Sequence, residues 1–132
     1  MENPSKVSKV ELPTYAEQLA LGIANGHDDS ILEMKIALYA NDQMKFAPVL
    51  FVLKQLWRRQ GELPKVGKFA FDMLNDPLCV CKGNSYLTGN LIGIIALHLP
   101  SHLAVAVQYA FPQTSSALTV FEAILAVHSV LK

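Results

Sequence analysis

The sequence predicts an all-α domain, a compact bundle or array of six to seven short helices. Three observations favour this class. Apolar residues recur at helical spacing, capping residues stand just before several of these stretches, and glycine or proline interrupts nearly every segment that could otherwise form a strand. Few segments alternate apolar and polar residues with a period of two, so we expect no half-buried sheet.

Length and composition indicate one domain with a substantial core. The chain has 132 residues, of which 52% are hydrophobic and 17% charged, a balance that excludes a disordered chain. Residues 1–13 are polar and lack the apolar run of a signal peptide, so we expect a flexible N-terminal tail and no secretion by that route. A single helical domain is expected over residues 14–132.

Two capping signals predict the first two helices. Thr14 and Glu17 form a capping box, in which each side chain accepts a hydrogen bond from the other residue's backbone N–H. The helix that follows is expected to end near residue 24. The acidic and hydroxyl side chains of residues 28–30 provide the next cap, before a helix over residues 30–40.

Prolines and glycines mark the two middle helices. Pro48 is expected in the first turn of a third helix, where its missing N–H costs little, and Gly61 should end that helix. Pro64 should open a fourth helix that closes before residues 75–77. The apolar stripe of the third helix consists of Val49, Leu50, Val52, Leu53, Leu56 and Trp57.

The C-terminal part of the chain is expected to form three more helices. Pro100 should end the fifth helix at the preceding residue, and Ser101 should cap the sixth. Pro112 should break the sixth helix, and Thr114 or Ser115 should cap the seventh. Because the seventh helix is apolar around most of its circumference, we expect it to be buried near the centre of the bundle.

The stretch from Gly83 to Phe121 contains no Asp, Glu, Lys or Arg. A membrane-associated protein that inserts this stretch is one interpretation. Pro100 divides the stretch into pieces with the length of buried core helices, and polar side chains such as His98 and Gln108 are costly in hydrocarbon. The core interpretation is therefore preferred, and membrane association ranks third among the functional hypotheses.

No pattern predicts chemistry. Cys79, Cys81, His98 and His102 are zinc-binding residue types, but Cys-x-Cys is tighter than the usual spacing and a proline separates the two histidines. We therefore predict no metal site, no cofactor and no catalytic residue, and a protein that is not an enzyme. Two cysteines this close do not form an ordinary structural disulfide, which favours a reducing compartment, the cytoplasm or the nucleus.

Charge is balanced overall but segregated along the chain. Six acidic residues and one lysine lie between Glu11 and Asp42, and six basic residues and one glutamate lie between Lys45 and Lys68. The resulting basic edge, one helix end and the turn after it, is a candidate contact for nucleic acid in a ribonucleoprotein or for a protein partner. A solvated face and head-to-tail association of copies are the alternatives. The candidate contact residues are Lys54, Arg58, Arg59, Lys65 and Lys68.

Two aromatic residues lie off the apolar stripes of their helices. Phe51 and Phe71 must each be covered by a second neighbouring helix or stand in water, where they would be interface anchors. The function that we favour from the sequence is therefore a non-enzymatic module for protein–protein interaction or self-assembly, with a protein partner or a second copy of the chain. Nucleic-acid binding through the basic edge is the second hypothesis.

Overall fold

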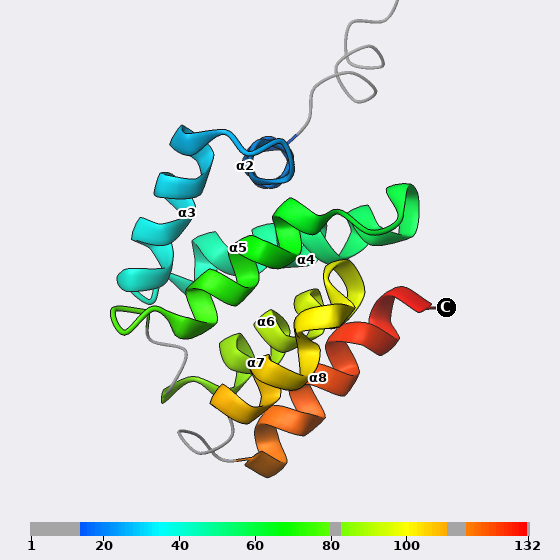
Figure 1. Ribbon diagram of the computed structural model, residues 1–132. Coiled ribbons are helices and arrows are strands. Elements are labelled where there is room, and N and C mark those ends of the chain that lie inside the picture. The colour runs from blue at the N-terminus through cyan, green and yellow to red at the C-terminus, as the bar shows by residue number, and fades with distance from the viewer. Residues whose placement is uncertain (1–13, 80–82, 111–115, 132) are drawn as a thin grey trace, which may run out of the picture.

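A computed structural model describes residues 14–79, 83–110 and 116–131, and it confirms the predicted all-α fold (Figure 1). These ranges contain seven α-helices, one short 3-10 helix and no strand. The helices are α2 (Tyr15–Ala24), α3 (Asp28–Tyr39), α4 (Gln43–Gln60), α5 (Pro64–Asn75), α6 (Ser85–His98), the 3-10 helix η2 (Pro100–His102), α7 (Leu103–Ala110) and α8 (Ser116–Leu131).

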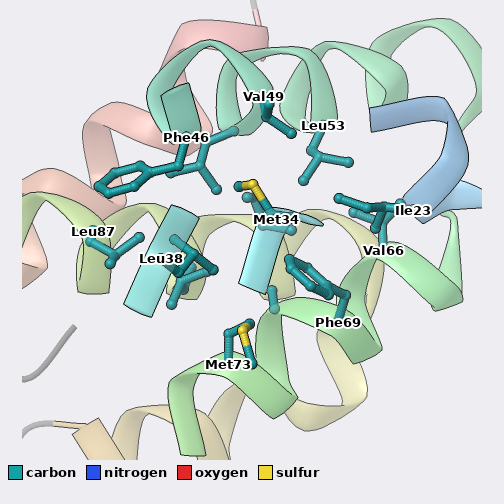
Figure 2. Packing of buried hydrophobic residues seen from close by; sticks show 14 of the residues in the cluster. Ile23, Met34, Leu38, Phe46, Val49, Leu53, Val66, Phe69, Met73 and Leu87 are labelled. Carbon is teal, nitrogen blue, oxygen red and sulfur yellow. The ribbon is translucent and has the colours of Figure 1, made fainter. Parts of the chain in front are cut away.

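The helices form two groups that meet at α4, α5 and α6. In Figure 1, α4 and α5 cross the middle of the view, with α2 and α3 on one side and α6, α7 and α8 on the other. The closest packing between helices is that of α6 with α8, followed by that of α6 with α5. The N-terminal group encloses a core in which Met34 of α3 lies among Val49 and Leu53 of α4 and Phe69 and Met73 of α5 (Figure 2).

The capping box at the start of α2 is present as predicted. The Thr14 N–H donates to the Glu17 carboxylate at 3.0 Å, and the Glu17 N–H donates to the Thr14 hydroxyl at 3.1 Å. Gly61, with φ 78°, ends α4, and Pro64 occupies the first turn of α5, both as predicted. A long-range hydrogen bond of 2.6 Å from the Tyr39 hydroxyl to Asp76 joins the end of α3 to the end of α5.

Two predicted helix starts are wrong by several residues. α3 begins at Asp28 rather than Ser30, and its N-cap, His27, makes no side-chain capping bond. α4 begins at Gln43, so Pro48 lies inside the helix rather than in its first turn. Pro48 is on the exposed side of α4. Because proline has no N–H, the carbonyl one turn earlier receives no helical hydrogen bond. On the exposed side of the helix this carbonyl can bind water, which lowers the cost of an internal proline.

The connection after α6 also differs from the prediction. Ser101, predicted to cap a helix, lies inside η2, and its hydroxyl hydrogen-bonds the ring of His102 at 3.1 Å. The predicted break at Pro112 and the predicted caps Thr114 and Ser115 fall outside the described residues.

The central helix is α6, and α8 is buried along one face. Nearly every residue of α6 from Leu87 to His98 is buried, because α5 and α8 both pack extensively on it and α4 and α7 also contact it. α8 packs against α6 and α4 and has Thr119, Ala126 and Val130 buried, while much of its remaining apolar surface is exposed. The expected burial of the C-terminal helix is therefore correct for one face, and its expected central position is wrong.

No helix among the described residues is both long enough and apolar enough to cross a membrane. The uncharged helix α6 has 14 residues and is about 21 Å long, shorter than the hydrocarbon layer of a bilayer. The uncharged stretch is instead divided among α6, η2, α7 and the start of α8.

Two glycines allow α6 and α8 to approach closely. A Cβ atom added at Gly89 would lie 2.4 Å from the Glu122 Cβ and 2.9 Å from the Ala123 backbone nitrogen. A Cβ added at Gly93 would lie 2.7 Å from the Ala126 Cβ. These neighbours are backbone or Cβ atoms, which cannot rotate away, so any larger residue would push the helices apart.

We expect Gly89→Ala to destabilise the fold by about 1–3 kcal/mol, because the overpacked interface costs more than the gain in helix propensity. Gly83→Ala is the matched control, since a Cβ there meets nothing within 4 Å. Thermal unfolding followed by circular dichroism measures both. Equal melting temperatures for the two variants would contradict the close packing of α6 and α8.

Candidate interaction surface

The structure separates the members of the predicted basic edge. Lys54 is buried, with 8% of its surface exposed, and its Nζ donates a 2.7 Å hydrogen bond to Asn90 Oδ1 on α6. It therefore cannot contact a phosphate on the outer surface. Arg58 and Arg59 are exposed in the last turn of α4, and Lys65 is exposed in the first turn of α5.

Lys68 already has an anionic partner. Its Nζ lies 3.1 Å from both carboxylate oxygens of Asp72, one helical turn further along α5. Lys65 and Lys68 line a groove of about 390 Å³ together with Lys35 of α3, over a floor that includes Ile23. The charge of this groove is thus partly compensated by Asp72.

The two predicted aromatic anchors have different environments. Phe51 is 53% exposed on α4, as an interface anchor must be. Phe71 is half-buried against the core, and its ring makes an edge-to-face contact with His102 at 5.2 Å between centroids. Phe71 is therefore covered within the molecule by a second neighbouring helix, whereas Phe51 stays a candidate anchor.

The histidine considered as a metal ligand joins three parts of the chain. His98 is fully buried; its Nδ1 accepts a 3.0 Å hydrogen bond from the Leu63 N–H, so its Nε2 is the donor to the Leu53 carbonyl at 2.8 Å. Both ring nitrogens are thus occupied by backbone groups. The described residues contain no group of three or more His, Cys, Asp or Glu side chains that could hold a metal ion, and Cys81 lies outside them.

An exposed apolar surface covers the outer side of α8. Between Ser85 and Leu131 the sequence has a single Asp, Glu, Lys or Arg residue, Glu122. A groove of about 460 Å³ runs beside this surface between α6, α7 and α8, and its lining is apolar except for His128. We call the exposed large apolar residues here the α8 surface. Its members are Leu118, Val120, Phe121, Ile124, Leu125 and Leu131.

Reasoning from the sequence missed both the α8 surface and the burial of Lys54. The second had a weak signal: Lys54 follows Leu50 by four residues, so it lies beside Leu50 at the edge of the apolar stripe of α4. The α8 surface had no such signal, because an apolar helix looks the same in sequence whether one or several neighbours cover it.

Comparison with known proteins assigns the chain to no family. No protein-family model matches the chain, and no curated protein or solved structure shows significant similarity to it. The function is therefore inferred from the surface and the interior of the molecule.

Protonation of His98 should couple stability to pH. Burial lowers the pKa of His98 from its ordinary value of 6.5, and the hydrogen bond to Leu53 only partly offsets this. Above pH 6.5 the ring is neutral in both states; below it the unfolded chain takes up more protons, so stability falls as pH falls. We expect His98→Gln, which retains a donor and an acceptor, to weaken this dependence in thermal unfolding between pH 7 and about pH 5. An unchanged pH dependence in the His98→Gln variant would contradict the burial of this ring.

The two phenylalanines should respond differently to substitution. Phe71→Ser should destabilise the fold by about 2 kcal/mol, because a half-buried ring leaves a partial cavity. Phe51→Ser should cost less than about 1 kcal/mol, since its ring is mostly in water. Chemical denaturation of both variants tests this, and a larger loss for Phe51→Ser would contradict the burial of the two rings.

Proposed function

We propose that this protein is a non-enzymatic self-assembly module, whose copies associate through the α8 surface. The observation that carries the proposal is the exposure of six large apolar side chains on the single helix α8. Water contact with such a surface is unfavourable, and contiguous apolar patches of this kind mark interaction sites. With 16 residues, α8 is about 24 Å long, enough for a helix–helix contact of several turns.

The charge distribution favours a second copy as the occupant. In a two-fold symmetric dimer the same surface meets itself, so a charged side chain close to the two-fold axis lies near its own copy. The α8 surface has no charged member, and a symmetric contact therefore brings no like charges together. A lipid surface is less well matched, because helices that lie on membranes carry Lys or Arg on their polar face, and residues 103–131 contain neither.

The groove beside α8 can receive side chains of a partner copy. Its apolar lining includes Ile92 and Ala96 of α6 and Leu103 and Val107 of α7. Side chains from the α8 of a partner copy would fill this groove and exclude water from both molecules. A contact confined to one helix and its groove is smaller than a standard interface, so we expect a reversible dimer of modest affinity.

Nucleic-acid binding, the second hypothesis from the sequence, has less support. It rests on Arg58, Arg59 and Lys65, because Lys54 is buried and Lys68 is paired with Asp72. Self-assembly is therefore the function that we put to the test.

The test is sedimentation velocity from the low to the high micromolar range of concentration. We expect the unmodified chain to move from monomer toward dimer, and the double variant Ile124→Ser, Leu131→Ser to stay monomeric, because it removes apolar area from the centre and end of the contact. The two positions are 60% and 58% exposed, so the fold should tolerate the change.

The matched control is the double variant Leu32→Ser, Ile36→Ser on α3, where the same residue types are 58% and 56% exposed. It should dimerise like the unmodified chain. A chain that is monomeric at every concentration, or equal loss of association in both double variants, would overturn the proposal.

A further inference from the structure

A small cavity of about 230 Å³ lies between α4, α6 and α8, on the flank of α8 where Glu122 is found. Its apolar wall is formed by Leu125 and Ala126, and its polar lining consists of Lys54, Tyr86, Asn90, Glu122 and Ser129. The volume equals that of about eight water molecules in the liquid, enough for a small organic molecule. The self-assembly proposed above does not account for this cluster.

Lys54 is held in this cavity by a hydrogen bond whose direction is fixed. The amide nitrogen of Asn90 donates to the Tyr86 carbonyl at 2.8 Å, which turns the amide oxygen toward Lys54 Nζ. One N–H of the amine is thereby engaged. The protonated amine has two further N–H donors, whereas the neutral amine has one further N–H and a free lone pair.

The surroundings of the amine favour its neutral form. Burial lowers the pKa of Lys54, and the opposing attraction of the Glu122 carboxylate is the smaller effect. More of Lys54 than of a solvated lysine is therefore unprotonated at neutral pH. A neutral amine in an apolar pocket is the form that attacks carbonyl carbon, as in enzymes that form Schiff bases.

We propose that this cavity is a reactive-amine site, in which Lys54 Nζ forms a reversible imine with a small aldehyde or ketone. The ligand class follows from the walls: the remainder of the molecule would lie on Leu125 and Ala126, so it is apolar, and it is not an anion because the Glu122 carboxylate lines the same cavity as the neutral amine.

The reaction balances without an oxidant or a reductant. The Nζ lone pair forms a bond to the carbonyl carbon, and the carbonyl electron pair moves to oxygen. A proton passes from nitrogen to that oxygen, giving a carbinolamine. The oxygen then leaves as water after taking a second proton, which the nitrogen releases as the C=N bond forms. Glu122, on the wall of the same cavity, is placed to relay these protons between nitrogen and oxygen.

The experiment is reductive trapping on the full chain. The protein is treated at neutral pH with limiting butanal and sodium cyanoborohydride, at a concentration where it is monomeric, and the alkylated lysines are identified by peptide mass mapping. We expect Lys54 to be alkylated severalfold faster than the exposed Lys65. Equal or slower reaction of Lys54 would overturn the proposal.

A further measurement separates a cavity site from chance reactivity. Leu125→Trp, at a position that is 45% exposed and lines the cavity, should slow the butanal reaction of Lys54 and leave that of Lys65 unchanged. Lys54 labelling that is insensitive to this substitution would exclude the cavity as the recognition site.

Discussion

The packing of α6 is the constraint on which the rest of the structure depends. This helix has no Asp, Glu, Lys or Arg and is buried along almost its entire length, so it needs neighbours on every side. α5 provides one of them and α8 another, and the backbone approach at Gly89 and Gly93 leaves no room for a side chain between α6 and α8. Because interiors are packed as densely as crystals, a change on α6 is transmitted to both groups of helices.

The sequence predicted the fold best where a local interaction decides it. The capping box of Thr14 and Glu17 and the terminator Gly61 need no distant partner, and both are found as predicted. The helix start predicted from Pro48 was wrong because a proline fits the first turn of a helix and also an exposed position inside one. An internal proline leaves one carbonyl without a helical partner, and water can bind that carbonyl when it is exposed. The position of α8 was unpredictable for a different reason, since apolar composition does not reveal how many neighbours a helix has.

The candidate sites depend on contacts between distant parts of the chain, which explains why they were harder to predict. Lys54 was grouped with Arg58 and Arg59 by charge, but its partner Asn90 is 36 residues away, in a stretch with no charged residue. A helical projection places Lys54 at the edge of the apolar stripe, beside Leu50, which is compatible with burial. It cannot identify the partner or the cavity, because these arise from the approach of α4, α6 and α8.

The hydrogen bonds of His98 also constrain how the molecule folds. The ring binds backbone groups 35 and 45 residues earlier in the chain, on the turn before α5 and on α4. The imidazole enters a dry interior only when both segments are in place, since a buried nitrogen without a partner is costly. Docking of α6 therefore closes two long loops in a single cooperative step, and the entropic cost of closing them falls on the same event.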